Sequence, residues 1–278
     1  MDRRLTPANT RVAALRLKGQ VEAETFTEGT PRTVAVPLAD LLSAPGGARD
    51  RQLLWGEAVT VYEERQGWAF VEAARDSYVG YVAATALAEP VEPTHFVAVS
   101  ASHLYPAPEL KERELAGLSF GSRFRIVSAA GNFYETAEGR FVPKPHLRPL
   151  NRPFADPATV AQLFFGAPYL WGGNSIRGID CSGLVQAAML ASGLPCPGDT
   201  DLQEAALGQP LDPAEPLRRG DLLFWKGHVA IAVDGETLIH ANAHHMAVAY
   251  ERAAEAIARI EGQGGSKVTS RRRPGQAA

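Results

Sequence analysis

The sequence predicts an α+β protein in which two small all-β units precede a larger domain of helices and strands. Three observations lead to this fold class: an internal repeat in the first half of the chain, a proline-dense segment near residue 150, and helical patterns followed by short strands beyond it. We therefore divide the 278 residues into an N-terminal extension (residues 1–30), two β-barrels (31–90 and 91–150) and a C-terminal domain (151–278).

The internal repeat predicts the two β-barrels. Val34-Ala35-Val36 followed by Ala44-Pro45 recurs as Val97-Ala98-Val99 followed by Ala107-Pro108. Further positions correspond in the same order: Trp55-Gly56, Val59, Val61 and Trp68 in the first copy, and Phe120-Gly121, Phe124, Ile126 and Phe133 in the second. Each copy consists of short alternating runs separated by glycine, proline and asparagine, which is typical of a small β-barrel. The alternative is that two unrelated all-β stretches share these residues by chance.

The C-terminal domain follows a connection rich in proline, a residue that continues neither a helix nor a central strand. The prolines are Pro143, Pro145, Pro149 and Pro153. Asp156-Pro157 then provides an N-cap and a first-turn proline for a helix. Helices are predicted over residues 158–165, 181–191 and 201–207, strands over 221–225, 228–233, 237–241 and 246–250, and a closing helix over 251–260. Helices followed by a meander of strands predict an α+β domain.

Composition and charge narrow the functional classes. With 45% hydrophobic residues the chain can bury a sizeable core, and its net charge of −3, with one basic run at residues 271–273, argues against nucleic-acid binding. No stretch has the length and apolarity of a signal-peptide core or a membrane span, so we expect a cytoplasmic protein that does not bind a membrane. In that reducing compartment, Cys181 and Cys196 are expected to be free thiols. The sequence leaves the oligomeric state open.

Cys181 is the first candidate for catalysis. It follows a loop-like stretch, residues 173–180, and precedes an apolar helical run, so we expect it in the first turn of a helix. Unpaired backbone N–H groups and the positive end of the helix dipole favour a thiolate there, which predicts a lowered pKa for the thiol. The alternative is a buried structural cysteine, the commoner fate of a free cysteine.

Two histidines could supply the base that a cysteine nucleophile needs. His228 begins one predicted strand and His240 ends the next, and a short turn at residues 234–236 would bring both imidazoles to one end of the sheet. One imidazole can then face the thiol while the other orients it. The alternative is that each is a half-buried, hydrogen-bonded residue with no special role.

A zinc site is a competing use of the same residue types. Its ligands would be His240, His244, His245 and Cys181. The three histidines stand on a predicted strand and turn, however, and not on one face of a helix. We therefore expect no metal and no cofactor, and we predict that His244 and His245 lie at the surface or at the rim of a cleft.

Five sequence blocks resemble the NlpC-type family of cysteine peptidases. They are Pro168-Tyr169-Leu170-Trp171-Gly172-Gly173, Gly178-Ile179-Asp180-Cys181-Ser182-Gly183-Leu184, Gly220-Asp221-Leu222-Leu223-Phe224-Trp225, Gly227-His228-Val229-Ala230-Ile231 and Leu238-Ile239-His240-Ala241. The resemblance covers about residues 155–265, and the preceding repeats resemble the bacterial SH3-like barrels that members of the family often carry in tandem. It implies a papain-like fold in which Cys181 is the nucleophile, His228 the general base and acid, and His240 the residue that orients His228.

One branch of this family, which carries two SH3-like barrels, resembles the chain most. This resemblance implies cleavage of γ-D-glutamyl-diaminopimelate bonds in cell-wall peptides that have a free N-terminal L-alanine, with release of a dipeptide. It also implies that Tyr169, Asp180 and Ser182 hold the N-terminus of the substrate. A carboxylate at Asp180 suits a site beside a thiolate when it faces a cation such as this ammonium group. The alternative is that Asp180 and Ser182 only cap the helix.

The first barrel also contributes to the substrate pocket in that branch, through a glutamate and a tyrosine. Glu57 and Tyr78 are the candidates here, and their alternative roles are an exposed charge and a packed aromatic residue. The chain has Pro197-Gly198-Asp199 where the family commonly has Pro-Arg-Asp, which leaves the role of Asp199 open.

The most direct functional hypothesis is therefore a cytoplasmic peptidase that recycles murein peptides. Two other classes stay open. One is a catalytically silent protein that binds cell-wall fragments, and the other is an amidase or acyltransferase on the same scaffold, because fold and catalytic residues do not determine the acceptor.

Overall fold

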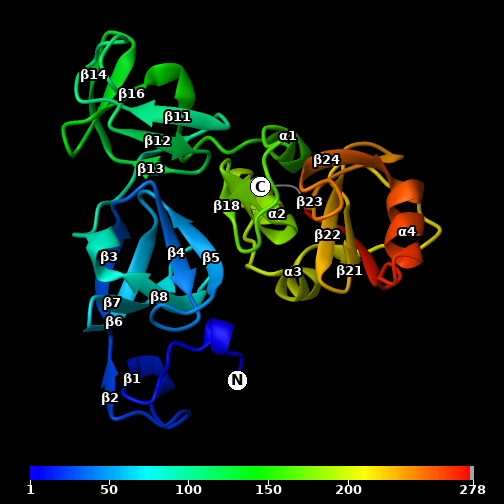
Figure 1. Cartoon of the computed structure of the whole chain (residues 1–278), viewed down its shortest axis with the longest axis horizontal. Helices are drawn as coiled ribbons and strands as arrows, with labels where there is room; N and C mark the ends of the chain where they lie inside the picture. The colour runs from blue at the N-terminus through cyan, green and yellow to red at the C-terminus, as the bar shows by residue number, and fades with distance from the viewer. Residues whose placement is uncertain (276–278) are drawn as a thin grey trace. The chain divides into compact units, whose positions relative to one another are not determined.

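The computed structural model of the chain describes residues 1–275, which divide into two compact units. The first unit is Met1–Leu150 and the second begins at Asn151 (Figure 1). The first unit contains only strands and short 3-10 helices, whereas the second contains four α-helices and a six-stranded sheet within its described part. This arrangement confirms the predicted α+β class. No helix within residues 1–275 is long and apolar enough to cross a membrane.

The first barrel is a seven-stranded antiparallel sheet with the order β5-β4-β8-β7-β6-β3-β9. Its strands are β3 Thr30–Val34, β4 Leu38–Leu42, β5 Arg49–Leu54, β6 Ala58–Arg65, β7 Trp68–Ala73, β8 Val79–Ala83 and β9 Leu87–Ala88. Alternating side chains of these strands point into a shared apolar core that includes Val34, Leu41, Leu53 and Val71. The apolar residues of the alternating sequence pattern therefore form the inward face of the barrel.

The N-terminal extension is folded against this barrel. Within it, β1 (Val12–Ala14) and β2 (Thr25–Thr27) form a parallel pair. Val12 and Ala14 are buried in one cluster with Tyr62 and Phe70 of the barrel. Residues 1–30 thus contribute apolar surface that shields the outside of the sheet.

The second barrel consists of three small antiparallel sheets, ordered β13-β10-β17, β11-β12 and β14-β15-β16. Its strands are β10 His95–Val97, β11 Ala101–Leu104, β12 Ala116–Ser119, β13 Arg123–Phe124, β14 Ile126–Ala130, β15 Phe133–Thr136, β16 Phe141–Pro143 and β17 Leu147–Pro149. The repeat in the sequence corresponds to repeated backbone hydrogen bonds. The Gly56 amide donates to the carbonyl of Val34 at 2.8 Å, and the Gly121 amide donates to that of Val97 at 2.9 Å.

Gly56 is also where the two barrels touch. It has a φ of +80°, and a β-carbon at this position would collide with the backbone carbonyl of Arg123. The neighbouring Trp55 ring packs on Phe124 with centroids 5.8 Å apart, and the Arg123 amide donates to the carbonyl of Trp55 at 2.7 Å. The contact between the barrels therefore requires glycine at position 56.

Substituting this glycine tests the contact. We expect Gly56→Ala to lower the free energy of unfolding by about 2–3 kcal/mol, because it adds a backbone collision to the strain of a positive φ. Gly67→Ala is the matched control, since Gly67 has a φ of +81° and open space around it. That variant should show only the conformational strain, about 1 kcal/mol. Chemical denaturation measures both, and equal losses would contradict a barrel contact at Gly56.

The second unit is built around a six-stranded antiparallel sheet with the order β20-β25-β21-β22-β23-β24. The strands are β20 Gln209–Pro210, β21 Leu222–Trp225, β22 His228–Ala232, β23 Thr237–Asn242, β24 Ala247–Arg252 and β25 Ser270–Arg273, and a small hairpin is formed by β18 Asn174–Ser175 and β19 Gly178–Ile179. The helices are α1 Pro157–Gln162, α2 Cys181–Ala191, α3 Thr200–Ala206 and α4 Ala253–Gly262. Figure 1 shows the sheet lying between α2 and α4. The buried helix α2 is thus held against β22 and β23.

Most predicted elements of this unit are present, and the predicted bounds of α2 are correct. Other bounds shift by one to three residues and the short strands β18, β19 and β20 were not predicted, but two larger differences stand out. The closing helix begins at Ala253, because Glu251 and Arg252 extend β24 and pair with β23. The basic run is the strand β25, inserted between β20 and β21, where Arg273 forms an ion pair at 2.8 Å with the buried carboxylate of Asp221. A strand of arginines offers no apolar alternation, so the sequence pattern did not reveal it.

Candidate active site

Asp180 fixes the loop that precedes α2 onto the first turn of this helix. It is the N-cap residue, and its Oδ1 accepts hydrogen bonds from the Gly183 amide at 2.6 Å and from the Ser182 hydroxyl at 3.0 Å. Its Oδ2 accepts a hydrogen bond from the Gly172 amide at 2.9 Å. The capping interaction therefore holds the residues on both sides of Cys181 in a single arrangement.

Cys181 is the first residue of α2 and is 7% exposed. Burial raises the pKa of its thiol to about 12, and the negative charge of Asp180 adds to this effect, whereas the backbone N–H groups of Val229, Ser182 and Cys181 oppose it. The expected lowering of this pKa is thus wrong for the isolated chain. The helix terminus does favour the thiolate, but desolvation and a neighbouring carboxylate outweigh it.

His228 and His240 lie side by side, as the pairing of β22 with β23 predicts. His228 Nε2 is 2.9 Å from His240 Nδ1. The backbone N–H of Val229, the residue after His228, interacts with the Cys181 sulfur. Cys181 and the two histidines therefore belong to one cluster at the end of the sheet.

Both imidazoles of this cluster are uncharged near neutral pH. Burial lowers the pKa of His228 to about 3, and the nearby His240 and Arg259 lower it further. Burial also lowers the pKa of His240 to about 4. Since the thiol pKa is raised, the resting pair is a neutral thiol beside a neutral imidazole.

Glu251 and Arg259 extend this cluster and were not predicted from the sequence. His240 Nε2 is 3.1 Å from Glu251 Oε2, and the Glu251 carboxylate forms a two-pronged ion pair with Arg259 at 2.8 Å for each contact. The sequence pattern predicted that Glu251 is the first residue of the closing helix. Continuing the alternation of β24 by two residues past Ala249, which pairs with His240, would have placed Glu251 on the histidine face.

Tyr169 lies near the same cysteine. Its backbone amide donates to the carbonyl of Met246 at 2.9 Å, and its side chain is half-buried. Burial raises the pKa of its phenol, with further contributions from Cys181 and Asp180. The structure therefore brings Tyr169, Asp180 and Ser182 together around Cys181, with a neutral phenol available as a hydrogen-bond donor.

Glu57 and Tyr78 are both buried in the first barrel. The Glu57 carboxylate accepts a hydrogen bond from Arg75 at 2.7 Å and another from the Leu54 amide at 3.1 Å. Tyr78 is 2% exposed, and the guanidinium of Arg51 lies 5.9 Å from the centre of its ring. Both side chains are thus engaged within the barrel, and their contribution to substrate binding stays a prediction.

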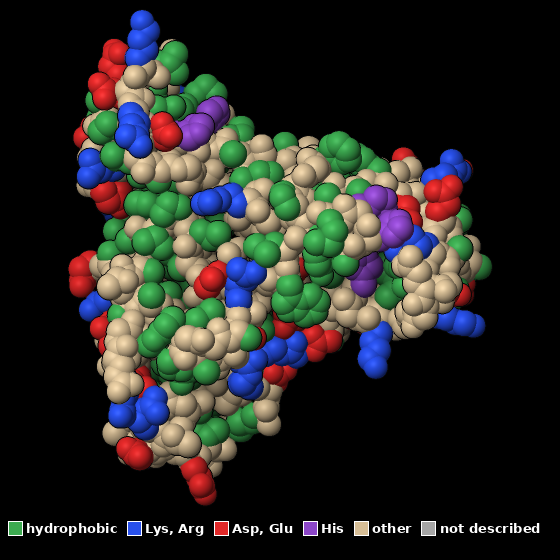
Figure 2. Space-filling model, in the orientation of Figure 1, with side chains coloured by type: hydrophobic (Ala, Val, Ile, Leu, Met, Phe, Trp, Pro, Cys, Tyr) green, Lys and Arg blue, Asp and Glu red, His purple; other side chains and the backbone are tan. Residues whose placement is uncertain are grey.

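The remaining predicted residues lie at the periphery. His244 and His245 are exposed in the turn between β23 and β24, and Figure 2 shows histidine side chains gathered on this face of the second unit. Within residues 1–275, no group of three or more His, Cys, Asp or Glu side chains has an arrangement that could hold a metal ion. Asp199 precedes α3 with a φ of +56°, and nothing in its geometry assigns it a role.

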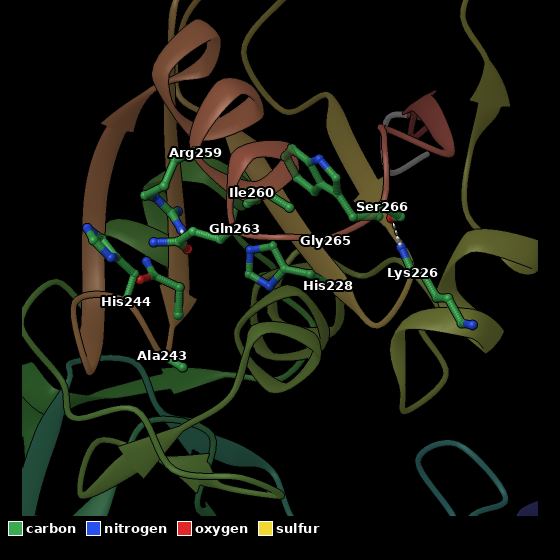
Figure 3. A pocket seen from close by; sticks show the side chains of 11 residues that line it. Lys226, His228, Ala243, His244, Arg259, Ile260, Gln263, Gly265 and Ser266 are labelled. Carbon is green, nitrogen blue, oxygen red and sulfur yellow. Dashed lines mark hydrogen bonds between the residues drawn. The ribbon is translucent and has the colours of Figure 1, made fainter.

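An open pocket of about 490 Å³ lies beside His228 (Figure 3). Its lining comes from three segments of the second unit, namely the β21–β22 hairpin, the turn after β23, and the end of α4 with the loop that follows. Figure 3 shows the imidazole of His228 at this pocket, with Arg259 and Gln263 contributed by α4 and its C-cap. His228 is therefore partly exposed at this pocket.

The chain is similar to known proteins in sequence and in fold. Residues 166–260 match the model of the NlpC/P60 family, and residues 41–87 match the bacterial dipeptidyl-peptidase Sh3 domain. A gamma-D-glutamyl-L-lysine dipeptidyl-peptidase of Bacillus subtilis (strain 168) is 31% identical over 215 residues, which cover 68% of this chain and 71% of that protein. Dipeptidyl-peptidase 6 of Lysinibacillus sphaericus is 38% identical over 85 residues, 30% of each chain. The crystal structure of an NlpC/P60 family protein from Bacillus cereus ATCC 10987 has a similar fold, with a TM-score of 0.75, 22% identity, and coverage of 88% of this chain and 99% of that one.

Proposed function

Because the chain belongs to the NlpC/P60 family of cysteine peptidases, we propose that it hydrolyses the γ-D-glutamyl–diamino acid bond of cell-wall peptides that carry a free N-terminal L-alanine. The observation that carries this proposal is the cluster of Cys181, His228 and His240 with a carboxylate, Asp180, next to the nucleophile. The names of the relatives from Bacillus subtilis and Lysinibacillus sphaericus support the substrate class.

In the proposed reaction, Cys181 attacks the γ-carbonyl carbon of the D-glutamyl residue. Since thiol and imidazole are both neutral at rest, His228 removes the thiol proton as the sulfur attacks. The backbone N–H of Cys181 at the start of α2 donates to the developing oxyanion. His228 then gives the proton to the leaving amine, and water activated by the same imidazole hydrolyses the acyl-enzyme. His240 orients His228 in both steps.

Asp180, Tyr169 and Ser182 would recognise the N-terminal ammonium of the substrate. A carboxylate offers about four acceptor positions, and the capping interactions of Asp180 occupy three. A bound ammonium would also offset the charge that raises the pKa of the Cys181 thiol. Substrate binding would thereby activate the nucleophile, which suits an enzyme that must react only with peptides of this class.

We further propose that the enzyme acts in the cytoplasm on peptides released from the wall. The support is chemical: in the intact wall the L-alanine nitrogen is bonded to the sugar and carries no charge, so a site built for an ammonium excludes it. A role in murein peptide recycling is consistent with this restriction.

One experiment tests the proposed function against its alternatives. Purified protein is incubated with L-alanyl-γ-D-glutamyl-diaminopimelate or its L-lysine counterpart, and the products are identified by mass spectrometry. We expect release of L-alanyl-D-glutamate. Binding without cleavage would identify a silent binding protein. Transfer of the dipeptide to an added amine in preference to water would identify an acyltransferase, and release of ammonia from the same peptide carrying a carboxamide on its diamino acid would identify an amidase.

A further inference from the structure

We propose that Glu251, held in place by Arg259, is a positioning residue that fixes the tautomers of His240 and His228, so that His228 presents an unprotonated Nδ1 to Cys181. This inference rests on the proposed function for the roles of Cys181 and His228. It adds to the reaction two residues that act on the base through His240.

The geometry forms an unbroken series of polar contacts. Arg259 Nε and Nη2 donate to Glu251 Oε1 and Oε2, each at 2.8 Å. Glu251 Oε2 lies 3.1 Å from His240 Nε2, and His240 Nδ1 lies 2.9 Å from His228 Nε2. The contacts connect α4, β24, β23 and β22 in that order. His240 is fully buried, so its ring has no water with which to exchange partners.

The proton positions follow from the donor and acceptor capacity of each group. The ion pair with Arg259 lowers the pKa of Glu251, so this carboxylate is ionised and can only accept hydrogen bonds. His240 must therefore carry its proton on Nε2. In a neutral imidazole the other nitrogen is then an acceptor, so Nδ1 of His240 accepts from Nε2–H of His228. By the same rule, Nδ1 of His228 is left unprotonated and can take the thiol proton.

The reverse arrangement disables the base. If His240 carried its proton on Nδ1, it would donate to Nε2 of His228. The proton of His228 would then sit on Nδ1, and neither ring nitrogen of His228 would be free to take the thiol proton. Without the carboxylate, nothing in the cluster selects between these two arrangements. Glu251 thus decides which of them exists.

Glu251 influences the charge of the two histidines as well as their tautomers. The groups that act on them are Glu251 on β24, Arg259 on α4 and His245 in the turn after β23. Glu251 raises the pKa of both imidazoles, whereas Arg259 and, for His240, His245 lower it. Glu251 therefore also stabilises the imidazolium that forms when His228 takes the thiol proton, and its removal would leave Arg259 as an uncompensated cation beside the two histidines.

The test uses Glu251→Gln, which keeps the size of the side chain but removes its charge and offers an amide donor to His240. We expect kcat to fall roughly 10- to 100-fold with little change in KM, a smaller effect than the ~10⁴-fold loss seen when the carboxylate bonded directly to a catalytic histidine is neutralised. Glu236→Gln is the matched control. It removes the carboxylate of another glutamate–arginine pair, with Arg252, that contacts no histidine, and it should leave kcat unchanged. Arg259→Lys retains the cation, whereas Arg259→Gln removes it. We therefore expect Arg259→Lys to keep most of the activity that Arg259→Gln loses.

Two further measurements separate this inference from the proposed function. The pH dependence of iodoacetamide alkylation, read for each cysteine by mass spectrometry, reports on Cys181 without a peptide substrate. Glu251→Gln should move alkylation of Cys181 to higher pH, and a thiol pKa higher by about one would slow the reaction near neutrality about tenfold. If this shift in alkylation occurs in a protein that cleaves no peptide, the role of Glu251 is upheld and the proposed peptidase function is refuted. Unchanged alkylation and unchanged kcat in a folded Glu251→Gln variant would overturn the role of Glu251 alone.

The wild-type chain provides a test that does not depend on any variant at Glu251 being folded. In ¹⁵N-histidine NMR spectra, the ring nitrogens of each neutral tautomer have distinct signals, which His228→Gln and His240→Gln assign by their absence. We expect His228 and His240 both to be in the Nε2–H tautomer. A proton on Nδ1 of His240 in the resting protein would overturn the proposal.

Discussion

We expect that replacing Cys181 with alanine or serine abolishes hydrolysis of the peptide while leaving the fold and peptide binding largely intact. The substitution removes the nucleophile and little volume, and the hydrogen bonds that hold the start of α2 involve Asp180, Gly183 and Gly172, not the thiol. Loss of the nucleophile in comparable enzymes lowers kcat by a factor on the order of 10⁶. The variants should therefore bind the intact peptide in calorimetry and release no dipeptide detectable by mass spectrometry.

Cys196 is the matched control for this prediction. It is buried, with its sulfur 3.5 Å from the backbone carbonyl oxygen of Pro197 and 3.6 Å from the side-chain amide nitrogen of Gln203. We expect Cys196→Ala to retain the wild-type kcat and to lose some stability. Substantial turnover by either Cys181 variant would remove Cys181 from the mechanism.

The parts of this site that the sequence predicts are those determined by neighbouring residues. Asp180 before an apolar run marks the start of α2, and the turn between β22 and β23 brings His228 to His240. Each conclusion depends on residues that are close in sequence. Capping preference and strand alternation are local rules, and here the packing agrees with them.

The parts that could not be predicted depend on contacts between distant segments or on burial. Glu251 reaches His240 only because β24 continues two residues beyond the predicted strand, and Arg259 meets it from a different helix. The raised pKa of Cys181 follows from the degree of burial, which the sequence does not specify. The helix dipole suggested the opposite direction, and desolvation was the stronger effect.

Acetylating the N-terminal amine of the peptide substrate should reduce kcat/KM far more than altering residues beyond the scissile bond. The physical reason is the small set of polar groups around Cys181. Asp180 is 8% exposed and Ser182 is 5% exposed, so an acetylated substrate would leave a buried carboxylate without its cation and would force an apolar methyl group against it. Sites built to bind a polar group reject analogues that lack it by about 10⁴-fold at best.

A substitution of Asp180 tests whether this residue causes the preference for a free N-terminal amine. Asn caps a helix as well as Asp does, so Asp180→Asn should keep the Oδ1 cap of α2 while removing the charge and the hydrogen bond from the Gly172 amide to Oδ2. In this variant the ratio of kcat/KM for the free peptide to that for the acetylated peptide should fall towards one, mainly through slower cleavage of the free peptide. Glu57→Gln, compared in the same assay, tests the predicted contribution of the first barrel: a reduced ratio would support it, and an unchanged ratio would count against it. Equal rates for free and acetylated peptides in the wild-type enzyme would show instead that the pocket is open at this end. The barrels would then serve only for attachment to the wall or for structure.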